Sequence, residues 1–141
     1  MENNLVRIRT LFNTAHLDKS DCNELIQITV NSSNEVERAY LAAGLMVSSK
    51  YHINPFKISK IFNEGKVQLE DLVSENFEEA EIRFLRYSIQ LNTPKFIGYS
   101  KNIDEDRLVL VNYIKANRNS ELTNHMMIFL KDTKDVILKA I

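Results

Sequence analysis

Residues 69–90, LEDLVSENFEEAEIRFLRYSIQ, are the stretch that decides the fold. Their apolar residues recur every three or four positions on both sides of a polar break around Asn76, a spacing typical of amphipathic helices. The break predicts a turn, and the glutamates after it suit the positive end of the dipole of a helix over 78–92. Two amphipathic helices joined by a short turn predict a helical hairpin.

The rest of the chain is patterned for helices as well. Only three glycines and two prolines occur in 141 residues, whereas folds of many short strands need such residues at their turns. The LVLV run at 108–111 also fits a buried strand, but we favour a helix because no good strand partner exists elsewhere. The further helices that we expect cover 4–16, a short segment through Leu25 and Ile28, 34–51, a segment from Asn54-Pro55 to a stop at Gly65, 66–75, a segment from Asp104 to Ile114 and a segment from Ser120 to Leu130.

Small and aromatic residues indicate where these helices pack. Gly44 lies inside the helix expected over 34–51, where a glycine costs about 1 kcal/mol relative to alanine. We therefore expect another helix backbone to approach closely at Gly44. In the next helix a core face is expected from Phe56, Ile58, Ile61 and Phe62.

The segment 69–86 resembles a junction between tetratricopeptide (TPR) repeats. Phe77 stands where that family usually has proline, and the match has no second copy at the repeat period of about 34 residues. The resemblance implies antiparallel helix pairs that pack in TPR-like fashion. The residues that fit the family pattern are Leu69, Glu70, Ala80 and Glu81.

A second resemblance covers residues 40–107. Their order of segments is similar to that of small uncharacterised all-helical proteins of the Bacteroidota, flavobacteria among them. The resemblance carries no known activity, and it implies a bacterial origin and an α-helical, TPR-like unit. We therefore predict a single all-α domain over 1–141, built of about six to eight helices in packed antiparallel hairpins, either TPR-like or an irregular helical bundle. The segments are YLAAGLMVSSKYHINPF, IFNEGKVQLEDLV, EIRFLRYSIQ, PKFIGY and NIDEDR.

Charge and composition exclude several classes of partner. Lys and Arg number 18 and Asp and Glu 19, so the basic excess of a general nucleic-acid binder is missing. No apolar run is long enough to span a bilayer. Cys22 is the only cysteine, which excludes an internal disulfide and a thiolate metal cluster. We expect no nucleic acid, no membrane and, because the start at Met1 shows no secretory signal, a cytoplasmic location.

The sharpest candidate site is a polar stripe on the helix expected over 78–92. Arg83, Arg86, Tyr87 and Gln90 follow i, i+3, i+4, i+7 spacing and therefore share one face. Two guanidinium groups one turn apart can hold a carboxylate or a phosphate with paired hydrogen bonds. The stripe predicts a groove that binds a peptide segment, with an acidic group meeting the two arginines.

Two structural explanations compete with binding, and together they are favoured. The stripe is either a solvated face on which Glu79 pairs with Arg83, or a buried arginine cluster tied to the acidic residues 104–106. The loop 95–101 has the same ambiguity, because its aromatic side chains either border the groove or anchor the loop to the core. The two aromatic residues that flank Gly98 are Phe96 and Tyr99. Core anchoring is the favoured role for this loop, but Tyr99 is kept as a candidate binding residue because loops often carry function.

The other reactive side chains carry no complete motif. The three histidines lack the HExxH spacing, and Gly65-Lys66 lacks the rest of a P-loop. Residues 104–106 lack EF-hand spacing, so helix capping is the favoured role. A helix start would lower the pKa of Cys22, yet packing is favoured for this lone thiol. We expect no metal and no cofactor.

These patterns favour a non-enzymatic, cytoplasmic protein–protein interaction or adaptor module whose partner is another protein or peptide segment. One alternative is a small enzyme or enzyme subunit with its site between the 78–92 helix and the 95–101 loop. A third is a structural homo-oligomer formed through the C-terminal helix. In that helix the run 126–130 exceeds a single apolar stripe, and further apolar positions follow at Val136, Ile137, Leu138 and Ile141.

Overall fold

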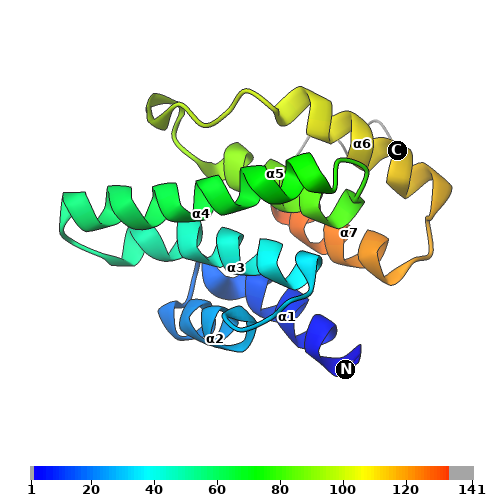
Figure 1. Cartoon of the computed structure of the whole chain (residues 1–141). Helices are drawn as coiled ribbons and strands as arrows, with labels where there is room; N and C mark the ends of the chain where they lie inside the picture. Colours follow the sequence, from blue (N-terminus) through cyan, green and yellow to red (C-terminus); the bar gives the residue numbers. More distant parts are fainter. Residues whose placement is uncertain (1, 134–141) are drawn as a thin grey trace. The chain divides into compact units, whose positions relative to one another are not determined.

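The structure is a computed structural model that describes residues 2–133, and Figure 1 shows its course. Within this range the chain forms seven α-helices and two single-turn 3-10 helices, with no strand. The all-α prediction is therefore confirmed. The strand alternative for 108–111 is wrong, because these residues lie inside the helix Ile103–Ala116.

The contacts within the chain divide it into two compact units, Met1–Phe77 and Glu78–Ile141. The single-domain prediction over 1–141 is not tested by this division and stays a prediction. The elements follow in the order α1 (Glu2–Ala15), α2 (Lys19–Thr29), α3 (Glu35–Ser48), η1 (Ser49–Tyr51), α4 (Pro55–Glu75), α5 (Ala80–Asn92), η2 (Lys95–Ile97), α6 (Ile103–Ala116) and α7 (Glu121–Thr133).

Side-chain caps begin three helices of the first unit. Asp18 accepts hydrogen bonds from two backbone N–H groups at the start of α2. Asn34 accepts one at 3.0 Å at the start of α3, and Asn54 accepts one at 2.9 Å at the start of α4. Each cap satisfies backbone donors that have no partner inside the helix. The helix starts predicted at Asn34 and Asn54 are confirmed.

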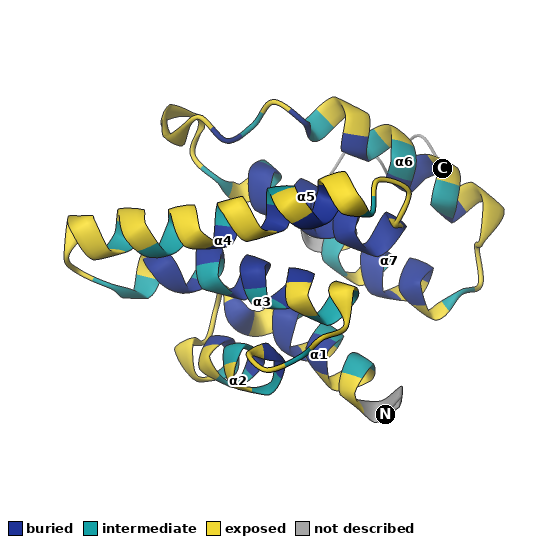
Figure 2. Cartoon of the chain, in the orientation of Figure 1, coloured by how far each residue is buried: buried dark blue, intermediate teal, exposed yellow. Residues whose placement is uncertain are grey.

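The first unit packs its helices in chain order around an apolar core. α1 contacts α2, α2 contacts α3, and α4 runs back along α3 (Figure 1). The rings of Phe12 and Tyr40 meet edge to face, with centroids 5.6 Å apart. Figure 2 shows buried and exposed faces alternating along these helices, as amphipathic spacing predicts. The buried apolar residues are Ile8, Leu11, Phe12, Ala15, Cys22, Leu25, Ala39, Tyr40, Ala42, Ala43, Met46, Leu69, Leu72 and Val73.

α4 continues through Gly65, so the helix end predicted at this glycine is wrong. A Cβ on Gly65 would stand 2.6 Å from the carbonyl oxygen of Ala42 and 2.8 Å from Cγ of Met46. The absence of a side chain is therefore what allows α4 to approach α3 so closely. The backbone approach predicted at Gly44 occurs at Gly65 instead. At Gly44 the neighbour is a side chain, with Cδ2 of Leu25 at 3.3 Å from the position of a Cβ.

The core face predicted for the start of α4 forms only in part. Phe56 is 86% exposed, so its predicted place in the core is wrong. Tertiary packing decides this point, and Figure 2 shows the first turn of α4 as exposed. The three other residues of that face are half-buried; they are Ile58, Ile61 and Phe62.

In the second unit, α5 is buried along nearly its whole length. Every residue from Ala80 to Gln90 is buried, and α6 packs along the helix. The ring of Phe84 meets the rings of His125 and Phe129 on α7 edge to face, with centroids 5.3 and 5.5 Å apart. α5 begins two residues later than predicted because Glu79 acts as its N-cap.

The apolar run of α7 divides between core and surface. Met126 and Leu130 are fully buried, whereas Ile128 is exposed. The apolar positions predicted at 136–141 lie outside the described residues. A homo-oligomer through this helix stays a prediction, as does TPR-like packing, with which the paired helices are compatible.

Candidate functional site

The structure places all five predicted site residues in the interior. Arg83, Arg86, Tyr87 and Gln90 lie on α5, and Tyr99 follows η2; their exposed fractions lie between 0% and 4%. The sequence predicts an open groove lined by Arg83, Tyr87 and Gln90, and these side chains are instead enclosed. Their contacts are therefore made within the chain, and a role in binding a partner stays a prediction.

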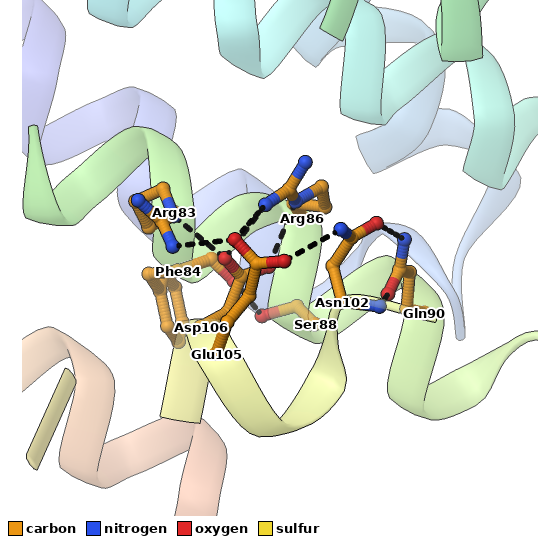
Figure 3. Close-up of polar contacts among 8 residues, drawn as sticks. All are labelled: Arg83, Phe84, Arg86, Ser88, Gln90, Asn102, Glu105 and Asp106. Carbon is orange, nitrogen blue, oxygen red and sulfur yellow. Dashed lines mark hydrogen bonds and ion pairs between the residues drawn. The ribbon is translucent and has the colours of Figure 1, made fainter. Parts of the chain in front are cut away.

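Both arginines pair with one fully buried carboxylate on α6. Arg83 Nε donates to Asp106 Oδ1 at 2.6 Å. Arg86 binds the same carboxylate with two donors, from Nε to Oδ2 at 2.8 Å and from Nη2 to Oδ1 at 2.9 Å. Figure 3 shows the two guanidinium groups converging on this carboxylate. The predicted paired recognition of an acidic group thus exists, and the acid belongs to the same chain.

A second carboxylate joins the cluster at its edge. Glu105 Oε2 accepts from Nη2 of Arg83 at 3.1 Å and from Nη2 of Arg86 at 3.4 Å, while its side chain stays 47% exposed. Its other oxygen accepts a hydrogen bond from Asn102 Nδ2 at 2.9 Å. The hydrogen bond from Asn102, with the charges of Arg86 and Arg83, holds the pKa of Glu105 below its ordinary value.

An amide clamp continues the network toward the loop that precedes α6. Gln90 Nε2 donates to Asn102 Oδ1 at 2.9 Å, and the backbone N–H of Asn102 donates to Gln90 Oε1 at 3.0 Å. The side chain of Gln90 therefore uses both its donor and its acceptor on one residue. This pair fixes the start of α6 against the end of α5 (Figure 3).

Tyr87 is held by a different contact on the same helix face. Its hydroxyl accepts a hydrogen bond from Arg107 Nε at 3.3 Å, and the Arg107 guanidinium lies 5.7 Å from the centre of its ring. Arg107 also pairs with Asp104, whose side chain is almost fully exposed. Residues of α6 and its N-cap Asn102 thus match the polar stripe on α5 along its length.

In the core cluster, the guanidinium groups of Arg83 and Arg86 pair with the carboxylates of Asp106 and Glu105. Buried ions are tolerated only when they are paired and hydrogen-bonded, and here both conditions hold. Of the two structural explanations offered above, the cluster tied to residues 104–106 is the one observed. The pairing of Glu79 with Arg83 is not, because Glu79 instead accepts from the backbone N–H of Glu81 at the start of α5. Helix capping as the role of Asp106 is likewise wrong.

The loop between α5 and α6 separates its two aromatic residues. Tyr99 is buried, which confirms core anchoring for this residue, whereas Phe96 is 87% exposed. Gly98 takes a left-handed conformation with φ of 81°, a region that residues with a Cβ seldom adopt. That turn lets the chain present Phe96 outward and still return Tyr99 to the interior.

Other reactive groups are occupied or enclosed. Burial raises the pKa of the Cys22 thiol to about 11, so the lowered pKa considered for this residue is wrong. Its Sγ lies 3.5 Å from the carbonyl oxygen of Gly44. Within residues 2–133 no group of three or more His, Cys, Asp or Glu side chains is placed to hold a metal ion.

Two features of the structure were beyond the sequence patterns. Asn102 precedes an acidic triplet, as a helix cap would, but its side chain binds Gln90 and Glu105 instead. The second is the exposure of Ile53, which directly precedes the N-cap of α4, and of Phe56 in the first turn of that helix. Its signal is the charge pattern, because residues 38–63 contain no Asp or Glu at all.

Comparison with protein-family models, with curated proteins and with solved structures found no match to this chain. Among the described residues, no helix combines the length and the apolar character that a membrane crossing requires.

Proposed function

We propose that the protein is a non-enzymatic interaction module that binds a segment of another protein through the loop 93–101. The observation that carries this proposal is the exposure of Phe96 at the tip of a loop whose two ends are fixed. The proposal keeps three expectations from the sequence: TPR-like packing of helix pairs, a bacterial origin and a cytoplasmic location.

The contacts on both sides of Phe96 support a preorganised loop. On one side, Thr93 Oγ1 donates to the carbonyl oxygen of Ile89 at 2.6 Å, which ties the loop to the end of α5. On the other side, the buried Tyr99 and the clamp between Gln90 and Asn102 hold the return to α6. A loop that is already ordered loses little conformational entropy when a partner binds.

The residues at the tip suit protein recognition. Aromatic side chains that enter a partner's pocket are common anchors of binding energy, and their removal typically costs 2 kcal/mol or more, about 30-fold in affinity. Ile97 extends the apolar surface beside Phe96, and Lys95 is exposed next to it. A partner with an apolar pocket and a carboxylate at its rim would match this tip.

The use of the reactive side chains supports a non-enzymatic role. Arg83 and Arg86 are paired with Asp106, and the thiol of Cys22 is buried with its pKa raised to about 11. His125 packs its ring against Phe84. Each of these groups therefore already makes a contact that serves the fold.

Affinity purification from the native cell tests the proposal. Proteins that co-purify with the wild-type chain are identified, and each is then purified and titrated against the wild type and Phe96→Ser. We expect a partner whose affinity falls at least about tenfold in Phe96→Ser, because the aromatic anchor is lost.

Leu108→Ser is the matched control, since Leu108 is an exposed apolar residue on α6 of the same unit. This variant should bind the partner as the wild type does. Equal affinities of wild type and Phe96→Ser for every co-purified protein would contradict the proposal.

A further inference from the structure

The connection between α3 and α4 combines positive charge with exposed apolar surface. Residues 38–63 contain one arginine and three lysines but no Asp or Glu, although the whole chain has 19 acidic residues among 141. The run without acidic residues covers most of α3, all of η1 and the first turns of α4. The chain therefore contains a locally positive segment, although its overall net charge is close to zero.

Four residues at this connection form a surface that we name the α4 tip: Ile53, Phe56, Lys57 and Lys60. Ile53 is 95% exposed, Phe56 is 86% exposed, and both lysines are exposed as well. Phe56 and Lys60 are four residues apart on α4 and therefore lie on the same face. Figure 2 shows this end of α4 in the exposed colour.

The exposure of Ile53 is informative because its position normally favours packing. It directly precedes the N-cap Asn54, where an apolar residue often packs against the fourth residue of the helix, here Ile58. An Ile that is 95% exposed does not make that contact. Its side chain therefore adds apolar surface to the exposed end of α4.

The backbone that carries the α4 tip is held firmly. Tyr51 Oη donates to the carbonyl oxygen of Ala15 at 2.6 Å, and the ammonium group of Lys50 donates to the carbonyl oxygen of His16. Asn54 caps the first turn of α4. These contacts restrain the backbone that carries the surface, which lowers the entropic cost of docking.

We propose that the α4 tip docks an acidic, amphipathic segment of a partner protein. Apolar side chains of that segment would cover Ile53 and Phe56, and its carboxylates would meet Lys57 and Lys60. Charge complementarity selects this occupant, because an apolar segment without carboxylates would leave the two lysines without counter-charges at the interface. Burial, together with the charges of Asp18 and Asp21, raises the pKa of Tyr51. Both carboxylates already accept hydrogen bonds near the turn between α1 and α2, Asp18 from the backbone N–H of Ser20 and Asp21 from the hydroxyl of Thr14.

The probe is a synthetic peptide of about 15 residues, near the minimum for a helix in water, with Leu and Phe on one face and Glu on its flanks. Its binding to the full chain is measured by fluorescence anisotropy. We expect saturable binding that weakens as salt is added, at least tenfold weaker binding in Lys57→Glu/Lys60→Glu, and a similar loss in Ile53→Ser/Phe56→Ser.

The matched controls change the same chemistry elsewhere. Lys19→Glu/Lys115→Glu makes the same change in net charge at exposed lysines of α2 and α6, and Val67→Ser removes an exposed apolar side chain from the same helix α4. Both should bind the peptide as the wild type does, and all variants should keep the helical circular dichroism of the wild type.

Several outcomes would overturn the proposal: no binding of the acidic peptide, equal binding of a peptide with Lys in place of Glu, or binding that the α4 tip variants leave unchanged. The protein could also sediment with phosphatidylserine vesicles in a way that requires Lys57 and Lys60, and fail to bind the peptide. The ligand of the α4 tip would then be a membrane surface, and the proposal would be wrong. These variants leave residues 93–101 intact, so a failure here is distinct from a failure of the proposed function.

Discussion

A guanidinium group on an exposed helix face can bind a carboxylate of another molecule, whereas the same group in the interior needs a carboxylate of its own chain. Arg83 and Arg86 are in the second situation. Their spacing of one turn lets both reach Asp106, which lies 23 and 20 positions further along the chain. Burial of the helix face, and not the choice of residues, decides between a ligand site and a structural cluster.

Removal of Asp106 should therefore be costly. Asp106→Ala removes the fully buried carboxylate that both guanidinium groups bind, and we expect the free energy of unfolding to fall by about 3–5 kcal/mol. Urea denaturation followed by circular dichroism measures the change. Arg83→Ala and Arg86→Ala should also lose stability, so a loss of binding in those two variants would accompany a loss of folding.

Asp104→Ala is the control, because its carboxylate lies two positions away on α6 and is almost fully exposed. Its pairing with Arg107 is at the surface, where such pairs contribute about 0–1 kcal/mol. If Asp106→Ala were as mild as this control, the buried cluster would not be a main source of stability in the second unit.

At the scale of elements, the sequence indicates helices well and helix ends less well. The caps at Asn34 and Asn54 act within one turn of the chain, so their effect can be predicted locally. Gly65 shows the limit of that approach. A glycine after a helical stretch is a common end signal, but here contact with α3 requires the glycine and the helix continues.

A methyl group at Gly65 should separate α3 from α4. We expect Gly65→Ala to lower the free energy of unfolding by about 1–3 kcal/mol, the usual cost of overpacking, even though alanine is the better helix former. The comparison is Gly44→Ala, where the neighbours are movable side chains at 3.3 and 3.4 Å and the change should stay within about 1 kcal/mol.

Midpoints of urea unfolding at equal slopes give both values. Equal stability of Gly65→Ala and Gly44→Ala would contradict the role that we assign to the close approach of α3 and α4.

At the scale of the whole molecule, the two compact units raise the question of how many cooperative units the chain has. If the chain is a single cooperative domain, a substitution that destabilises the second unit also lowers the free energy of opening of the first. Cys22 offers a probe in the first unit, because its thiol is buried and its pKa is raised to about 11. Such a thiol reacts slowly until the structure around it opens.

The test is the rate at which 5,5′-dithiobis(2-nitrobenzoic acid) labels Cys22 in Asp106→Ala. For a single domain, a loss of about 3–5 kcal/mol raises the open population, and with it the labelling rate, by at least about 100-fold. Asp104→Ala should label like the wild type. A rate in Asp106→Ala equal to that of the wild type would mean that the first unit opens on its own.

The sequence by itself determined the all-α class, most helix starts, and the set of polar residues that share one face of α5. These features follow from interactions within a few residues of the chain, namely caps, turns and the 3.6-residue period. Tertiary structure alone decided that Asp106 is the partner of Arg83 and Arg86, that Gly65 lies inside a helix, and that Phe56 and Phe96 are exposed. These outcomes depend on how elements distant in the sequence pack: Asp106 lies 23 and 20 positions from the two arginines, and Ala42 lies 23 positions from Gly65.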